Sequence, residues 1–592
     1  MKIKVSDLIA KFLKEKKINH VFVFTGGAAL HLIDSANKYG IKTIPLLHEQ
    51  SCAMAADAYS RITQNIGATI STSGPGATNL VTGVCGAYFD SVPVIYITGQ
   101  VATFRSKGNL KVRQLGFQET DCESLFKNIT KYCVKLKKSS DILFELEKAY
   151  HIANAGRKGP VLLDIPDNLQ REIVDDSKIK RFINRKNKKV INKNQINKFK
   201  KLILKAERPI LILGWGIHLS DTYCECKKFI KKFNIPFVKT WAVSHFIDKK
   251  NNLYNLGTWG THGKRYSNLA VQNSDLIISL GSRLDTKATG TPTSSFARKA
   301  KKIMIDIDNN EILKFKGKFK IDLSLSVDLK TFFKKFNNIK VEFPYKKLKK
   351  WREKIIQWKY RYPLNYEKSF SKNDINPYKF FKILSEKINK NSVIISDTGC
   401  TIAWLCQTFN FKENQLLLHD FNNTAMGWAL PAGIAAKLIM KKKDVIIITG
   451  DGSLSLNFQE LSNFKNNNLD VKIFLLDNGG HSMIRQTQDT WLNSKYIASS
   501  TSTGLPKINF NFHASKFGFK TFKLSNDINI SNKINNILKS KQRTFCTIKI
   551  DEKFGVEPQV LFGSPNEEMS PLLESKKLKD EIEKTTIKRD TD

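Results

Sequence analysis

The sequence predicts an α/β protein made of three doubly wound parallel-sheet domains. Short β-branched runs alternate with helical stretches along the whole chain, which is the pattern of parallel strands covered by helices. At roughly 150 residues per packed unit, the 592 residues are enough for about three or four units. The composition, 41% hydrophobic and 26% charged, is that of a globular protein and argues against extended disorder.

The strand-like runs fall into three groups. We expect strands at 21–24, 42–45, 68–71, 94–98 and 161–165 in the first group, at 209–213, 276–280 and 302–307 in the second, and at 392–396, 444–449 and 471–476 in the third. The first and third groups span similar lengths but show no sequence repeat.

Stretches rich in lysine and asparagine separate the three groups. We expect domains at 1–172, 196–337 and 376–552, linkers at 173–195 and 338–375, and a C-terminal lid or tail at 553–592. Pro and Gly punctuate this last segment, and such segments can fold over the mouth of an active site. Its charged part after Leu573 is expected to be disordered.

The N-terminal residues 1–19 read as a core helix rather than a targeting signal. Apolar residues recur there at helical spacing, with Ser6 as the expected N-cap: Val5, Leu8, Ile9, Phe12 and Leu13. The segment contains acidic residues and lacks the long apolar stretch of a signal peptide. No run reaches the roughly 18 apolar residues of a membrane span, so we expect a cytoplasmic protein without a membrane partner.

Charge and cysteine content narrow the possible partners. The chain has 97 Lys and Arg against 54 Asp and Glu, a formal net charge of +43, which alone suggests nucleic acid. The lysines are dispersed, as in 227–233, without interleaved aromatic residues, so we interpret them as solvated helix faces and expect no nucleic-acid partner. The nine cysteines form no CxxC pair and no metal-like Cys/His spacing, so we expect a reducing cytoplasm rather than a disulfide framework or a zinc site.

The densest chemistry lies in the third group. Gly450-Asp451-Gly452-Ser453 follows one apolar strand, and Asn478 closes the next strand, 27 positions after Asp451. Carboxyl ends of neighbouring parallel strands bind ligands, and glycines there let backbone amides approach a phosphate. Asp and Asn oxygens suit a hard cation such as Mg²⁺, so the pattern predicts a diphosphate held through magnesium. The tripeptide alone would be only a tight turn.

This combination resembles the signature of the thiamine diphosphate (ThDP) enzyme family, in which Gly-Asp-Gly is followed by about two dozen residues and Asn-Asn. The first Asn of the pair is Asp477 here. The resemblance implies ThDP and Mg²⁺ as cofactors, with Asp451, Asn478 and the backbone carbonyl of Gly480 as metal ligands.

The first group contains the family's second signature. Leu47-His48-Glu49-Gln50 is similar to the segment that carries the catalytic glutamate, so Glu49 is expected to share a proton with the aminopyrimidine ring of the cofactor. Phe117-Gln118-Glu119-Thr120 resembles the acetolactate synthase branch, in which the Phe-Gln pair faces the reacting carbon. The resemblance also implies Gly27 as a backbone donor to the reacting oxygen, although Gly26-Gly27 is equally a strand-to-helix turn.

The same resemblance implies a larger set of contacts to ThDP. Met426, otherwise an ordinary core residue, would wedge under the cofactor. The residues expected to bind ThDP are Gly76, Asn79, Thr398, Gly399, Cys400, Thr401, Met426, Gly450, Asp451, Gly452, Ser453, Asn478, Gly480, Ser482 and Met483.

The middle group resembles the FAD-binding domain of acetolactate synthases. The implied flavin is structural, and a nucleotide fold without a ligand is the alternative. The residues expected at FAD are Gly214, Gly216, Thr240, His262, Arg283, Asp285 and Asp306, with Arg283 facing its phosphates and Asp306 its adenine side. A second basic position of this motif is Lys287 rather than arginine, which replaces a bidentate fork by a point charge.

The resemblance implies decarboxylation of a 2-oxo acid such as pyruvate and transfer of the acyl unit to a second carbonyl, as in branched-chain amino acid biosynthesis. Thr487 stands where that branch carries a tryptophan, which predicts a larger acceptor pocket, and Arg485 is expected to attract an anionic acceptor. A carboligase for sugar carbonyls, a simple decarboxylase and, remotely, a basic nucleic-acid-binding protein stay open. The family also implies a homodimer or homotetramer with active sites between subunits, and a small regulatory subunit is possible.

Overall fold

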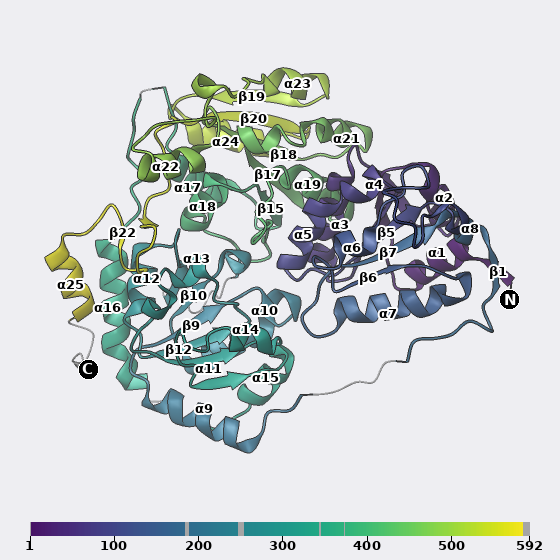
Figure 1. The fold of residues 1–592 in the computed structure, drawn as a ribbon. Coiled ribbons are helices and arrows are strands. Elements are labelled where there is room, and N and C mark those ends of the chain that lie inside the picture. Colours follow the sequence, from purple (N-terminus) through teal and green to yellow (C-terminus); the bar gives the residue numbers. More distant parts are fainter. Residues whose placement is uncertain (1, 184–188, 247–253, 342–344, 372, 584–592) are drawn as a thin grey trace.

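The computed structural model describes residues 2–183, 189–246, 254–341, 345–371 and 373–583. Three lobes, each built on a six-stranded parallel sheet with helices on both faces, make up the molecule (Figure 1). The predicted α/β class with three doubly wound sheets is therefore confirmed. In the described residues, no helix combines the length and hydropathy needed to cross a lipid bilayer.

The first sheet has the strand order β3-β2-β4-β5-β7-β6. Its strands are β2 (His20–Val23), β3 (Lys42–Pro45), β4 (Gly67–Ser71), β5 (Val94–Gln100), β6 (Tyr132–Lys135) and β7 (Val161–Pro166). Its helices are α1 (Val5–Glu15), α2 (Leu30–Lys38), α3 (Glu49–Thr63), α4 (Pro75–Thr78), α5 (Val81–Phe89), α6 (Cys122–Phe126), α7 (Ile142–Asn154) and α8 (Asp167–Arg171). A short antiparallel pair, β1 (Lys2–Lys4) with β8 (Ile173–Asp175), lies beside it.

The third sheet repeats the order of the first: β16-β15-β17-β18-β20-β19. Its strands are β15 (Ser392–Ser396), β16 (Leu416–Leu418), β17 (Asp444–Gly450), β18 (Lys472–Asp477), β19 (Lys520–Leu524) and β20 (Thr544–Lys549). Its helices are α17 (Pro377–Lys387), α18 (Cys400–Thr408), α19 (Ala429–Ile439), α20 (Asp451–Leu454), α21 (Leu461–Asn466), α22 (Ser482–Trp491), α23 (Phe510–Lys516) and α24 (Ile530–Lys539). In both sheets the third strand of the chain lies beside the first, so the two folds are topological copies.

The middle sheet differs, with the order β11-β10-β9-β12-β13-β14. Its strands are β9 (Pro209–Leu213), β10 (Phe237–Lys239), β11 (Asn255–Thr258), β12 (Leu276–Leu280), β13 (Lys301–Ile305) and β14 (Leu323–Leu325). Its helices are α9 (Lys193–Lys205), α10 (Gly216–Leu219), α11 (Tyr223–Phe233), α12 (Arg265–Gln272), α13 (Thr286–Thr289), α14 (Asn309–Leu313), α15 (Leu329–Phe336) and α16 (Leu348–Arg361). In chain order the strands run 3-2-1-4-5-6, the arrangement of dinucleotide-binding folds, with the switch point between β9 and β12.

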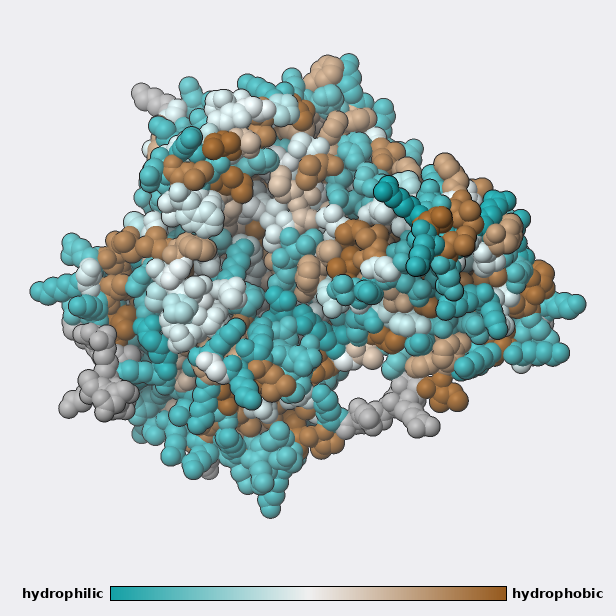
Figure 2. Space-filling model, in the orientation of Figure 1, coloured by the Kyte–Doolittle hydropathy of each residue, from teal (hydrophilic) through white to brown (hydrophobic). Residues whose placement is uncertain are grey.

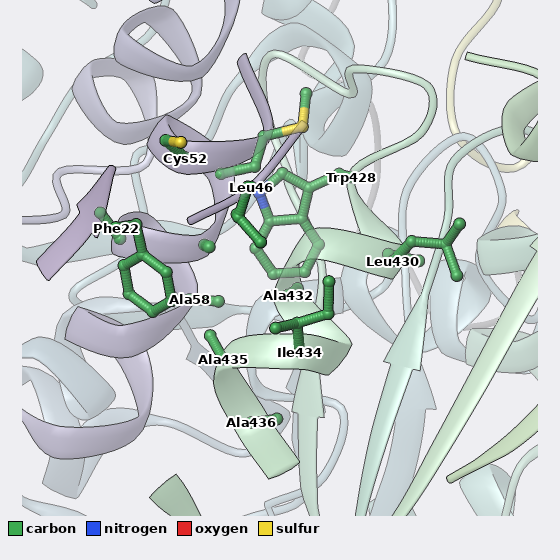
Figure 3. Close-up of a cluster of buried hydrophobic side chains, with 14 of the residues drawn as sticks. Phe22, Leu46, Cys52, Ala58, Trp428, Leu430, Ala432, Ile434, Ala435 and Ala436 are labelled. Atoms are coloured by element: carbon green, nitrogen blue, oxygen red, sulfur yellow. The ribbon is translucent and has the colours of Figure 1, made fainter. Parts of the chain in front are cut away.

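The first and third domains share one hydrophobic core. Helix α3 packs against α19, and alanines on both helices let their backbones approach closely. Figure 3 shows residues of both domains in this cluster, with the indole of Trp428 at its centre. The indole Nε1 also donates to Asp57 Oδ2 at 3.2 Å, so a buried polar contact fixes the register of the two helices.

Helix α1 begins differently from the prediction, and every cysteine is a thiol. The apolar face of α1 is buried as predicted, but its N-cap is Lys4, and Ser6 Oγ instead accepts a hydrogen bond from Ser35 at 2.8 Å. The Ser6 cap was therefore wrong. All nine cysteines, each within the described ranges, carry free thiols.

The segments flanking the third domain are more structured than expected. The stretch 338–375 contains α16, whose Trp351 and Trp358 are buried against the middle domain. Helix α25 (Ser575–Glu583) lies within the tail expected to be disordered and runs beside α16 (Figure 1). The carboxylate of its Glu581 accepts from Trp358 Nε1 at 2.6 Å, so the disorder predicted after Leu573 is wrong up to residue 583; 584–592 lie outside the described residues.

The C-terminal segment crosses from the third domain to the middle domain. The strands β21 (Gln559–Val560) and β22 (Met569–Ser570) pair antiparallel, and Val560 N donates to Thr261 O at 2.8 Å. Farther on, Asn566 Nδ2 donates to Ala288 O at 2.7 Å. This part of the predicted lid is therefore anchored on the middle domain.

Candidate active site

The carboxyl ends of β17 and β18 bring Asp451 and Asn478 to the same sheet edge. Gly450 pairs with Leu476 in the parallel register, so the residues that follow each strand end at the same level. Oδ1 of Asp451 and Oδ1 of Asn478 are both buried, and neither has a hydrogen-bond partner in the described part of the chain. Two orphaned side-chain oxygens at one edge are suitable ligands for a hard cation.

Electrostatics at this edge also favour a cation. Burial, and then the neighbouring carboxylate of Asp477, raise the pKa of Asp451 to about 7, against hydrogen bonds from the N–H groups of Gly452 and Gly480. A bound cation would remove this penalty on the negative form. No group of three or more His, Cys, Asp or Glu side chains suited to a metal occurs among the described residues. A cation at this edge would therefore be bound by the Asp451 carboxylate together with an amide oxygen and a backbone carbonyl.

The loop after Asn478 is held in a form that requires glycine. Gly480 has φ +137°, and a Cβ there would lie 2.5 Å from Ser499 O. Arg485 is buried, and its guanidinium donates to Asn478 O at 2.8 Å, to Ser499 O at 3.0 Å and to the buried Ser482 Oγ at 2.8 Å. The prediction that Arg485 attracts an anionic acceptor is therefore wrong, because its guanidinium is buried and donates to the carbonyls of Asn478 and Ser499.

Met426 reaches the same edge from the segment before α19. Its Cε would lie 3.4 Å from a Cβ at Gly452, whose nearest neighbour would be Nδ1 of His481 at 2.5 Å. Gly452 thus lets His481 and Met426 approach the backbone of the Gly-Asp-Gly turn. Ser453 is buried in the first turn of α20, and Met483 packs against the hydrophobic core from α22.

The loop after β15 forms the third part of this edge. Thr398 and Gly399 precede α18, Gly399 has φ +77°, and Cys400 and Thr401 are buried in the first turn of the helix. Thr401 Oγ1 would lie 3.6 Å from a Cβ at Gly450, which joins this loop to the Gly-Asp-Gly turn. The predicted residues of the third domain therefore lie around one edge of one sheet.

Asp397 was missed by the sequence analysis. Its carboxylate accepts from Gly427 N at 3.0 Å and from Thr449 Oγ1 at 3.0 Å, so it connects β15, β17 and the segment that carries Met426. Burial raises its pKa to about 6, against these hydrogen bonds. Its position at the carboxyl end of a buried strand was the available signal.

Glu49 occupies the corresponding edge of the first domain. It is the first residue of α3, is buried, and its Oε2 accepts from Asn79 Nδ2 at 2.9 Å. A Cβ at Gly76 would lie 3.7 Å from Oε1, so Gly76 and this oxygen are neighbours. The structure thus brings Glu49, Gly76 and Asn79 together as predicted.

Of the other predicted catalytic residues, Phe117 and Gly27 are exposed, and Gln118 is half-buried against Gly74. Phe117 is 86% exposed, and Gln118 has the left-handed φ of +63°. Gly27 is exposed in the turn after β2, and a Cβ there would meet no atom within 4 Å. Phe117 and Gly27 thus lie at the surface of the first domain, whereas Glu49 itself is buried.

Within one chain, hydrogen bonds connect α3 to the third domain. Leu47 N donates to Glu460 Oε1 at 3.0 Å, and Ser51 Oγ donates to Asn457 Oδ1 at 3.3 Å. Asn457 Nδ2 in turn donates to Gly427 O at 2.9 Å. These buried contacts place the start of α3 against the segment next to Met426.

A separate cavity lies at the switch point of the middle sheet. Six of the seven residues predicted for FAD line it: Gly216, Thr240, His262, Arg283, Asp285 and Asp306. The seventh, Gly214, lies behind the wall, where a Cβ would come within 2.2 Å of Gly281 O. The glycines thus let the turns after β9 and β12 touch backbone to backbone.

The cavity contains several orphaned polar atoms. Trp215 Nε1, Thr240 Oγ1, Trp259 Nε1 and His262 Nδ1 are buried and have no hydrogen-bond partner among the described residues. Burial lowers the pKa of His262 to about 3 and raises that of Asp306 to about 6. Such a set of aromatic and unsatisfied polar groups fits a large planar ligand with polar edges.

All three domains contribute to this cavity, which the sequence analysis missed. Phe89, Asp90 and Arg157 come from the first domain, and Phe421 and Asn422 from the third. Below it, the buried guanidinium of Arg61 donates to Asp57, to Asp90 and to the carbonyl of His419. Arg283 Nη2 donates to Asn422 Oδ1 at 2.9 Å, so this predicted phosphate contact also bridges two domains.

Comparison with known proteins finds three family domains along the chain. Residues 3–125 match the thiamine pyrophosphate enzyme N-terminal TPP binding domain, 196–336 the central domain and 397–550 the C-terminal TPP binding domain. The chain is 30% identical to the acetolactate synthase large subunit of Lactococcus lactis, with 95% of each chain covered. It is 32% identical to that of Cyanidium caldarium (94% and 95% covered) and 31% identical to that of Buchnera aphidicola (95% and 98%). On this evidence the chain belongs to the acetolactate synthase large subunits, a branch of the thiamine pyrophosphate enzymes.

Proposed function

We propose that the protein decarboxylates a 2-oxo acid, with pyruvate as the first candidate, and transfers the acyl unit to a second carbonyl with the help of ThDP and Mg²⁺. With pyruvate in both roles, two pyruvate ions and one proton give one 2-acetolactate ion and CO₂. The observation that carries this proposal is the pair of orphaned oxygens on Asp451 and Asn478, at the edge where the family binds its cofactor.

The chain's own residues divide the work. Asp451 Oδ1, Asn478 Oδ1 and the carbonyl of Gly480 would hold Mg²⁺, and the amides of the Thr398–Thr401 loop would meet the diphosphate. Asn79 occupies Oε2 of Glu49, which leaves Oε1 for the proton shared with the pyrimidine ring. Bound ThDP supplies the electron sink that accepts the electron pair released by decarboxylation.

A product assay tests this function. Protein with ThDP, Mg²⁺, FAD and ¹³C-pyruvate should give labelled acetolactate and CO₂ in NMR spectra. Labelled acetaldehyde alone would mean that the acyl unit is protonated rather than transferred. No turnover despite bound ThDP would exclude pyruvate as the donor.

The cavity of the middle domain is the proposed FAD site. Its strand order, its glycine contacts at the switch point and its orphaned polar atoms support a dinucleotide there. Lys287 lies 4.0 Å from the centroid of the Trp241 ring, and burial lowers its pKa. Purified protein should therefore carry flavin, visible by its absorbance, in a ratio near one per chain.

A homodimer would complete the active site. One segment of the first domain exposes several large apolar residues, namely Phe104, Leu110, Leu115 and Phe117. In Figure 2, brown hydrophobic groups interrupt the teal surface where Figure 1 shows this domain. A second copy that covers the segment with its third domain would bring Glu49 to the cation site of the partner, and the mass in solution tests this.

A bulkier carbonyl acceptor is the second candidate. Thr487 Oγ1 donates back to Met483 O at 3.0 Å, so this short side chain leaves its face of α22 open. One turn farther, Trp491 pairs edge-to-face with Phe562 at 5.0 Å between ring centroids, and both rings are exposed. Competition between pyruvate and larger aldehydes for the labelled acyl unit would distinguish the two acceptors.

A further inference from the structure

The loop 106–119 presents Phe117 and Gln118 at the surface of the first domain. It joins the turn after β5 to α6, and most of its residues are exposed. Gln118 adopts a left-handed backbone conformation that non-glycine residues rarely take. Something in the surrounding structure must therefore hold this loop in place.

One carboxylate closes the loop at both ends. Glu119 accepts from Ser106 Oγ at 2.5 Å and from Lys107 N at 2.9 and 3.1 Å at the start of the loop. It also accepts from Leu115 N at 3.2 Å and from Gly116 N at 3.3 Å near the end. Partial burial opposes the charged form, but these hydrogen bonds lower the pKa of Glu119 to about 2.

The loop position is passed on to the catalytic glutamate. A Cβ at Gly74, which has φ +61°, would lie 2.9 Å from Gln118 Cβ, so the glycine lets Gln118 settle on the Gly74–Gly76 turn. Gly76 in the same turn lies beside Glu49 Oε1. Glu119 itself is half-buried and its carboxylate contacts residues of the loop, so it acts on Glu49 through Gln118.

We propose that Glu119 is a positioning residue that holds Phe117 and Gln118 where the acceptor meets the bound donor, and so favours transfer over release. This rests on the proposed function. After CO₂ leaves, the acyl carbon either forms a C–C bond to the acceptor carbonyl, whose oxygen takes a proton, or takes a proton itself and leaves as an aldehyde. A loose loop admits water to the second route.

The test is Glu119→Gln, which keeps the size of the side chain but turns an NH₂ group toward backbone N–H donors. We expect CO₂ release from ¹³C-pyruvate to stay within about threefold, while the ratio of acetaldehyde to acetolactate rises about tenfold or more, since displacements near 1 Å can cost 10²-fold. Hydrogen exchange at the amides of Leu115 and Gly116 should become faster, which reports on the loop without using activity.

Asp121→Asn is the matched control. Asp121 lies two residues farther on, and its carboxylate caps α6 through Ser124 N at 3.1 Å and Ser124 Oγ at 2.7 Å, without touching the loop. It removes the same charge, so its product ratio should equal that of the wild type. Equal ratios in all three proteins, or equal changes in both variants, would overturn the proposal.

Ser106→Ala tests the same proposal if Glu119→Gln does not fold. It removes one of the donors and leaves the carboxylate in place, so a smaller rise in the aldehyde fraction is expected and an unchanged fraction would contradict the proposal. The wild type is assayed first: no product from pyruvate would refute the proposed function itself, and the positioning role with it. If the wild type makes acetolactate, the proposed function stands, and the product ratios of the Glu119 and Ser106 variants then test the positioning role alone.

Discussion

The first and third domains share one strand order but treat their polar groups in opposite ways. In the first domain, the Glu49 carboxylate is already paired with Asn79, at 2.9 Å. In the third, Asp451 Oδ1 and Asn478 Oδ1 are buried without partners among the described residues. Copies of one fold thus hold a carboxylate that is already paired in one domain and two buried oxygens without partners in the other, so the difference lies in which buried oxygens are satisfied.

Removing the proton site should have the largest effect. Glu49→Gln is expected to lower turnover about 10²–10⁴-fold, since the amide cannot exchange a proton, while ThDP affinity stays near that of the wild type. Steady-state rates and calorimetry measure the two quantities. Glu123→Gln, an exposed charge change in the same domain, is the control, and full activity of Glu49→Gln would remove this residue from the mechanism.

Removing the cation site should act on binding instead. Asp451→Ala is expected to weaken Mg²⁺-dependent ThDP binding by at least about 100-fold, because even outer-shell partners of a metal contribute 10–100-fold. Asp444→Asn, at the exposed opposite end of β17, should leave affinity unchanged. Equal affinities of the Asp451 variant and the wild type by calorimetry would refute the assignment.

The middle sheet has a different strand order, and a bulkier residue at its switch point should affect flavin binding. Gly214→Ala would place a methyl group 2.2 Å from Gly281 O, and overpacking of this kind costs about 1–3 kcal/mol. We expect less flavin absorbance per chain, with ThDP binding retained. Gly159→Ala meets only the flexible Lys131 side chain and should keep its flavin.

A smaller effect is expected at the acceptor. Thr487→Trp fills the open face of α22 and should shift product ratios toward small 2-oxo acid acceptors by about 10-fold, the scale of discrimination by apolar contact. Competing acceptors at equal concentration, analysed by NMR, give this ratio. An unchanged ratio would show that Thr487 lies outside the acceptor pocket.

The smallest effect concerns the pH dependence of stability. Asp397 has its pKa raised from 3.8 to about 6, so between these values the folded chain binds a proton that the unfolded chain lacks. Stability from this group therefore falls as pH rises through that window. Asp397→Asn removes the slope, so its Tm relative to the wild type should rise by about 3 °C from pH 4 to 6. A constant Tm difference would contradict the shift.

The sequence identified most of the central strands and missed most of the edge strands, with three exceptions: the interior strands β10 and β20 were not predicted, and the edge strand β3 was. The predicted strands 209–213, 276–280 and 392–396 coincide with β9, β12 and β15, because strands buried on both faces are continuous apolar runs. The edge strands β11, β14 and β16 have three or four residues and were not predicted. Short edge strands depend on neighbours that are distant in sequence.

Site residues with a local sequence motif could be predicted, whereas those that depend on distant contacts could not. Asp451, Asn478 and Glu49 stand next to strand ends with local motifs, and the structure places each at its expected edge. The shared cavity could not be predicted, since the hydrogen bond from Phe421 N to Asp90 joins residues 331 positions apart. Arg485 was misread because its spacing gives its helix face but not the carbonyls that surround it.

The anchored C-terminal segment has a consequence for synthesis on the ribosome. The middle domain needs Asn566 and Glu581 to complete contacts with α13 and α16, yet about 230 residues separate its end from these partners. At 5–20 residues per second, roughly 10–50 s pass between the two. Until α25 has been synthesised, the surfaces of α13 and α16 that these residues cover stay exposed, and chaperones have that interval in which to bind them.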